Sequence, residues 1–176
     1  MSLRISQVLP TLHRLRPVTF GARLRDRFCI NASAPIGAAA QKMAANRLTF
    51  VMVCEDEGDS GADRDAPHVL GMVTERDFMR YLTYAADHSF FSGAHPLDKR
   101  TDSVMTPLGR MTALSPETTV SQALRSIQHR IWRHLPVVSM DATSGKGVLT
   151  SIIGLRDLIQ VSSGVGDSQS APLRQV

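Results

Sequence analysis

The chain has little of what membrane-spanning, disulfide-rich or nucleic-acid-binding proteins need. Its 176 residues contain no uncharged apolar run that approaches the ~18 residues of a membrane helix. Cys29 and Cys54 are the only cysteines, which indicates free thiols in a reducing compartment rather than a disulfide framework. The six histidines and two cysteines are scattered, without the spacing of metal ligands. We therefore expect no membrane span and no metal site.

The positive net charge belongs to the N-terminal end of the chain. Residues 1–28 carry six arginines against one aspartate, whereas the rest carries 14 basic and 15 acidic residues. A nucleic-acid binder usually carries its positive charge as a patch on the folded domain, and aromatic residues for base stacking are few here, so we expect no nucleic-acid partner.

The arm formed by residues 1–25 is Arg-rich, acid-poor and amphipathic up to Pro17, which is typical of a mitochondrial presequence. The alternatives are a basic bacterial extension and an arm that docks on a partner. The arm predicts a mitochondrial location, and a cytoplasmic one otherwise.

Two similar segments follow the arm. Residues 36–53, IGAAAQKMAANRLTFVMV, align with residues 120–137, VSQALRSIQHRIWRHLPV, at an offset of 84. The shared apolar positions have helical spacing at first and then alternate as on a strand. Residues 71–82, GMVTERDFMRYL, align with residues 151–162, SIIGLRDLIQVS, at an offset of 80. The offset changes because the polar, acidic loop of the first copy is longer; we interpret this loop as a solvated hairpin connection without a function.

Each copy predicts a strand, a helix, two strands and a helix. A unit of this size buries too little surface to be stable alone, so the two copies should share one core. The predicted fold class is therefore α+β, with two pseudo-symmetric β-α-β-β-α repeats at 26–84 and 112–162, a linker at 85–111 and a flexible tail at 163–176. The expected elements are 28–30, 35–46, 50–54, 69–73 and 75–84 in the first copy, and 112–114, 119–130, 135–138, 147–153 and 155–162 in the second.

The duplicated pattern resembles the CBS domain, which is named for cystathionine β-synthase. The resemblance covers about residues 26–162 and rests on GMVTERD and SIIGLRD, on SVMTP at 103–107, on LSPETTVSQAL at 114–124 and on RHLPVV at 133–138. No catalytic or transporter domain is attached, so the chain is similar to stand-alone CBS pairs. The resemblance implies a Bateman module, in which two repeats pack sheet to sheet and leave two clefts. It also implies a homodimer that binds an adenosine ligand (AMP, ADP, ATP or S-adenosylmethionine) and regulates a partner protein, without catalysis or a required cofactor.

The family's ligand motif, Gly-h-x-Thr/Ser-x-x-Asp, falls on Gly71, Thr74 and Asp77. A carboxylate such as Asp77 can accept hydrogen bonds from both ribose hydroxyls, and the helix N-terminus favours a phosphate. Gly71 would let the backbone approach a flat base. The alternative for Thr74 and Asp77 is an ordinary capping box.

The second copy carries Ser151, Gly154 and Asp157 in place of the three motif residues. The carboxylate remains, whereas the hydroxyl is lost. Asp157 either acts on the helix dipole alone or keeps a role at the ribose. By the family pattern this second site is degraded.

A phosphate needs cations, and Arg133 and His134 occupy the place of the family's basic pair before a strand. Because the repeats are pseudo-symmetric partners, these two residues are expected to complete the site that Thr74 and Asp77 begin. The alternative for them is a solvated strand edge. Pro136 is a candidate for the apolar slot of the adenine, although it is equally consistent with plain core.

A different function is also consistent with the sequence. The loss of the hydroxyl at position 154 and the long termini favour a non-catalytic structural or accessory subunit of a larger mitochondrial assembly, with the ligand site partly lost.

Overall fold

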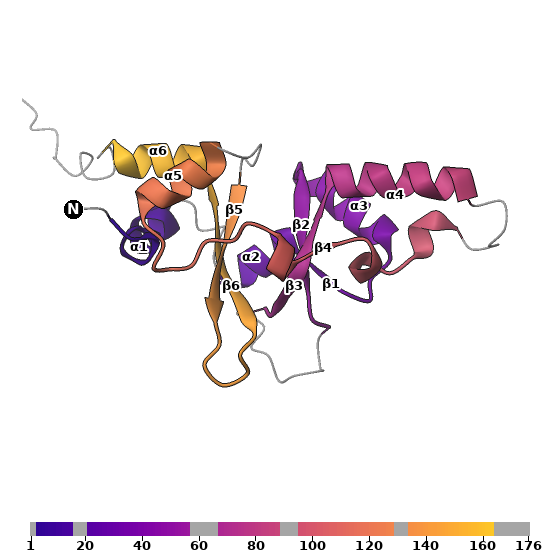
Figure 1. Ribbon diagram of the computed structural model, residues 1–176, viewed down its shortest axis with the longest axis horizontal. Helices are drawn as coiled ribbons and strands as arrows, with labels where there is room; N and C mark the ends of the chain where they lie inside the picture. The colour runs from indigo at the N-terminus through magenta and orange to yellow at the C-terminus, as the bar shows by residue number, and fades with distance from the viewer. Residues whose placement is uncertain (1–2, 16–20, 57–66, 89–94, 129–133, 164–176) are drawn as a thin grey trace, which may run out of the picture.

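The computed structural model describes residues 3–15, 21–56, 67–88, 95–128 and 134–163. Two β-sheets lie side by side at the centre of the molecule, and helices cover the outer face of each (Figure 1). This arrangement confirms the predicted α+β fold with two repeats packed through their sheets.

The first repeat contributes three strands to a four-stranded sheet with the order β1-β2-β3-β4. β1 is parallel to β2, whereas the other neighbours are antiparallel. The fourth strand comes from the segment between the repeats, which was expected to be only a linker. The elements are β1 (Cys29–Asn31), α3 (Ile36–Asn46), β2 (Phe50–Cys54), β3 (Val69–Thr74), α4 (Glu75–His88) and β4 (Thr106–Pro107), with short 3-10 helices η3 (Pro96–Asp98), η4 (Thr101–Ser103) and η5 (Leu108–Arg110).

The second repeat forms a two-stranded antiparallel sheet that carries two helices. The strand predicted at 112–114 does not form, and only Leu114 makes a parallel bridge, to Val137. The chain leaves the sheet directly after Leu114, because a turn closed by a hydrogen bond from Thr118 N to Ser115 O follows (3.0 Å). The elements are α5 (Val120–Gln128), β5 (His134–Met140), β6 (Gly147–Gly154) and α6 (Leu155–Ser162).

The core between the sheets is built from the strand faces that point at each other. This cluster joins β2 and β3 to β5 and β6, and α2 (Gly21–Phe28) adds Leu24 and Phe28. Cys29 and Cys54 lie in it as free buried thiols, as the sequence indicates. The hydrogen bond with Cys29, followed by burial, raises the pKa of Cys54 well above its usual value, which disfavours the thiolate. The strand residues whose side chains fill the space between the sheets are Met52, Cys54, Val69, Met72, Val138, Leu149 and Ile152.

The N-terminal arm is part of the second repeat's core. It forms α1 (Ile5–Leu15), whose buried side chains Ile5, Val8 and Leu12 follow the spacing of a one-sided amphipathic helix. These three residues pack in one cluster with α5, α6 and the outer face of the β5–β6 sheet. The amphipathic pattern that is typical of a presequence therefore has a structural use within the fold.

The docking of the arm repeats a contact found on the other side of the molecule. Ile5 N–H donates to Thr118 O at 2.8 Å, and Thr101 N–H donates to Ala34 O at the same distance. Ala34 and Thr118 are equivalent positions of the two repeats, 84 residues apart. Each repeat is thus held by the segment that precedes the other, so the pseudo-symmetry extends beyond the predicted repeats.

Candidate functional site

Thr74 and Asp77 form a complete capping box at the start of α4. Thr74 N–H and Thr74 Oγ1–H both donate to Asp77 Oδ2, at 3.0 and 2.6 Å, and Asp77 N–H donates to Thr74 Oγ1 at 3.2 Å. The box uses one carboxylate oxygen and leaves Oδ1 outside it. Asp77 is half-buried, so the cap and a hydrogen bond from a second group to Oδ1 are compatible.

A row of residues leads from this cap across to the second repeat. Thr74 is paired with Phe50 on the neighbouring strand, and the Phe50 ring lies 5.8 Å from the ring of His134. His134 is in turn paired with Gly154, the counterpart of Thr74. Thr74 and His134, expected to serve one site from opposite repeats, are therefore separated by a single aromatic residue. Arg133, the other expected cation, lies outside the described residues.

The row has an aromatic neighbour that the sequence reasoning missed. Phe28, at the end of α2, stacks on Phe50 with ring centroids 6.1 Å apart. The guanidinium of Arg27 lies 5.6 Å from the centre of the Phe28 ring, and its Nη2 donates to Asn46 O at 3.3 Å. The place of Phe50 could be predicted from the sequence, because it occupies the position in the first repeat that is equivalent to His134 in the second.

Gly71 is surrounded by the chain itself. A Cβ atom at this position would lie 2.4 Å from Thr106 O and 2.9 Å from Met105 Sδ. Gly71 is paired with Pro107 across β3 and β4, so the close approach that needs a glycine here is the approach of the inter-repeat segment. The space that was expected for a base is occupied by Met105 and Thr106.

In the second motif, the carboxylate already serves as part of the cap of the helix that follows, α6. Asp157 is only 4% exposed, and its Oδ2 accepts the Gly154 N–H at 2.7 Å. The carboxylate thus keeps half of a capping box, because Gly154 has no hydroxyl to supply the other half. Ser151 is buried, and Pro136 is buried opposite Ile152 in the middle of the hairpin, which places both within the packed sheet.

The described ranges offer neither a metal site nor a membrane span. Their residues hold no group of three His, Cys, Asp or Glu side chains arranged to bind a metal ion. None of the helices placed there has the length and apolarity to cross a bilayer.

Comparison with known sequences assigns the family. The CBS domain matches residues 23–84 and 102–164, which is more than half of the chain. The chain therefore belongs to the CBS-domain family and carries a pair of CBS domains. No curated protein sequence matches the chain.

Solved structures share the fold over nearly their whole length. A CBS-domain protein from Agrobacterium tumefaciens is 25% identical, with a TM-score of 0.50, over 82% of this chain and 98% of the other. CBSX2 from Arabidopsis thaliana is 15% identical, with a TM-score of 0.56, over 94% and 97%. A structure of CBSX2 in complex with AMP is 16% identical, with a TM-score of 0.58, over 92% and 97%. At these identities, the two CBSX2 structures show that the fold is shared.

Proposed function

We propose that this CBS pair binds an adenosine nucleotide and regulates a partner protein, without catalytic activity of its own. The observation that carries the proposal is the cap of α4, where Asp77 Oδ1 lies outside the capping box at a helix N-terminus. A ribose could donate to this oxygen, while the backbone N–H groups of the first turn would face a phosphate. The AMP complex of CBSX2, a protein of the same fold, supports an adenosine ligand.

The ligand would lie between the repeats. His134 contacts Phe50, which is paired with Thr74, so an imidazole from the second repeat lies next to the cap of the first. A molecule bound to both would favour one tilt of the repeats over another, which is what a partner could read.

Titration calorimetry with AMP, ATP and S-adenosylmethionine tests this proposal. We expect Asp77→Asn to weaken AMP binding by roughly ten- to a hundredfold, because a hydrogen bond to a charged group contributes about 1.5–3 kcal/mol. The amide oxygen of this variant can still accept the cap's hydrogen bond. Asp157→Asn is the matched control, since its carboxylate is buried in the cap of α6. No heat with any of the three compounds, in a folded protein, would contradict the proposal.

The same proposal includes a homodimer formed by the outer helices. Met79 on α4 and Ile159 on α6 occupy equivalent positions and are 60% and 54% exposed. Large apolar side chains at equivalent, exposed helix positions are what a symmetric interface needs.

A structural or accessory subunit remains the second candidate. The specific observation that favours it is the second motif, where the buried Asp157 already accepts the Gly154 N–H. The mitochondrial location expected from the arm stays a prediction. Because Ile5, Val8 and Leu12 fill the core of the second repeat, we propose that residues 3–15 remain attached to the mature protein.

A further inference from the structure

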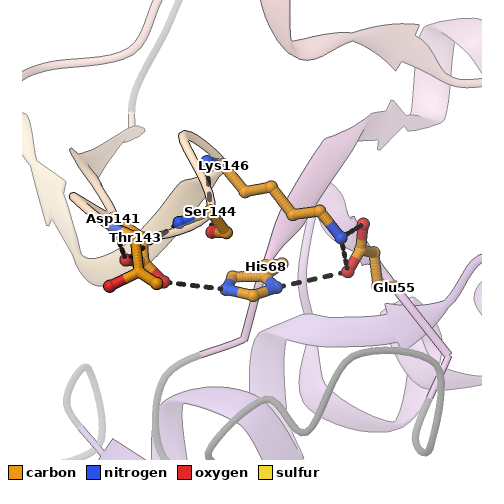
Figure 2. Close-up of polar contacts among 6 residues, drawn as sticks. All are labelled: Glu55, His68, Asp141, Thr143, Ser144 and Lys146. Atoms are coloured by element: carbon orange, nitrogen blue, oxygen red, sulfur yellow. Dashed lines mark hydrogen bonds and ion pairs between the residues drawn. The ribbon is translucent and has the colours of Figure 1, made fainter.

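Figure 2 shows a cluster that includes four ionisable side chains. The strand registers place it at the end of the sheets away from the candidate site. His68 Nδ1 lies 3.2 Å from Glu55 Oε2, and His68 Nε2 lies 3.7 Å from Asp141 Oδ2. Lys146 Nζ contacts both oxygens of Glu55, at 2.7 and 2.8 Å. Glu55 and His68 belong to the first repeat, whereas Asp141 and Lys146 belong to the hairpin of the second.

The cluster and the Phe50–His134 contact sit at opposite ends of the same strands. β2 begins at Phe50 and ends next to Glu55, and β5 begins at His134 and ends next to Asp141. Backbone contacts accompany the charges, since Leu149 N–H donates to Pro67 O at 3.1 Å across the repeats. The two repeats are therefore joined at both ends of their sheets, by rings at one end and by charges at the other.

The charge contacts of His68 depend on its protonation. The side chain is only 8% exposed, so water does little to replace a lost partner. A carboxylate can only accept hydrogen bonds, and a neutral imidazole carries one N–H. A neutral ring that donates from Nδ1 to Glu55 would present a lone pair at Nε2 to Asp141, whereas an imidazolium presents an N–H to each.

Three other ionisable side chains, Glu55, Asp141 and Lys146, face the ring. Among the described residues of the cluster, Glu55 and Asp141 carry two negative charges and Lys146 one positive charge, and a proton on His68 would add the second positive charge. The backbone N–H of Thr143, followed by the side chain of Ser144, holds the pKa of Asp141 below its usual value. Asp141 therefore stays ionised over the range in which histidine changes its charge.

We propose that His68 is a proton-dependent clasp between the two repeats, closed when both ring nitrogens carry a proton and open when the ring is neutral. The clasp joins the first repeat at Glu55 to the second repeat at Asp141. It sets how firmly the charged end of the sheets is held, and so how freely the repeats tilt about the aromatic end. This property belongs to the ligand-free protein and does not depend on nucleotide binding.

A double-mutant cycle in the full chain tests the clasp without any ligand. The substitutions His68→Gln and Asp141→Asn are made singly and together, and urea unfolding is measured at pH about 5.5 and about 8. Asn keeps the oxygen that accepts the Thr143 and Ser144 N–H groups. We expect the two substitutions to be coupled by roughly five- to tenfold in the unfolding equilibrium constant at the lower pH, and by a factor near one at the higher pH.

His13→Gln is the control, because this histidine is exposed on α1 and lies outside the cluster. Its coupling to Asp141→Asn should be a factor near one at both pH values. A coupling between His68 and Asp141 that is equal at both pH values, or that grows as the pH rises, overturns the proposal.

Hydrogen exchange supplies a local measurement for the case in which a variant folds poorly. The Leu149 amide bridges the repeats next to His68, whereas the Val138 amide bonds to Leu114 O within the second repeat. In the unmodified protein, after correction for intrinsic exchange rates, the protection of Leu149 should fall several-fold from pH about 5.5 to about 8 while that of Val138 stays constant. Protection of Leu149 that does not change with pH contradicts the clasp.

Discussion

Phe50 and His134 occupy equivalent positions of the two repeats, 84 residues apart, and their rings touch at a centroid distance of 5.8 Å with the planes tilted by 40°. A contact between equivalent positions marks the place where the pseudo-twofold axis passes between the repeats. The tilt of the repeats proposed above would therefore take place about this contact.

The ring contact should be measurable as a coupling. We expect Phe50→Leu and His134→Gln each to destabilise the fold, and to be coupled by about 0.5–1.5 kcal/mol in urea unfolding, which is the usual range for an aromatic pair beyond its buried area. Phe28→Leu paired with His134→Gln is the control. Phe28 stacks on Phe50 and is one ring further from His134, so the coupling of this pair should be smaller. Strictly additive effects of the Phe50 and His134 substitutions would show that the contact contributes nothing to stability.

Gly71 should tolerate no side chain. A Cβ atom would lie 2.4 Å from the backbone oxygen of Thr106, which cannot move without displacing β4, so we expect Gly71→Ala to cost about 1–3 kcal/mol in the free energy of unfolding. Gly109→Ala is the control, since a Cβ atom added there would meet nothing within 4 Å. Thermal unfolding compares the two variants. Equal melting temperatures would contradict the conclusion that the close approach of Thr106 requires a glycine at position 71.

Local patterns predicted most of the fold. The bounds of β2 and α6 are those expected, because β2 is a short apolar run that is buried on both faces and α6 has its apolar residues at helical spacing. The strand expected at 112–114 is reduced to the single bridge of Leu114, and the turn that begins at Ser115 ends the pairing directly after it.

The candidate site was predictable only in part. The cap formed by Thr74 and Asp77 is a local motif, so its spacing in the sequence suffices to find it. The cluster around His68 was missed because Glu55 and Lys146 are 91 residues apart in the sequence. They come into contact only because the two repeats pack against each other in the fold. The acidic loop was expected to be a solvated connection without a function, yet its two ends, Glu55 and His68, anchor the inter-repeat contact.

Charges on the outer helices should dissociate the proposed homodimer. We expect Met79→Glu and Ile159→Glu to shift the protein toward the 19.2-kDa monomer in sedimentation equilibrium, because both substitutions would bury a carboxylate in an apolar interface. Met140→Glu is the matched control, since Met140 is 67% exposed on the hairpin of the second repeat. A wild-type chain that is monomeric, or a dimer that all three substitutions leave intact, would exclude this interface.

The packing of α1 makes a last prediction that separates a structural arm from a removable one. Leu12 is buried in the core of the second repeat, so Leu12→Ala should cost about 2–5 kcal/mol in the free energy of unfolding, as for other buried leucines. Arg14→Ala is the control on the exposed side of the same helix and should be nearly neutral. Deleting residues 1–15 should be more damaging than Leu12→Ala, because the backbone bond of Ile5 to Thr118 is lost as well. If the shortened chain is as stable as the full one, then the arm is dispensable to the fold and a cleaved presequence becomes the better interpretation.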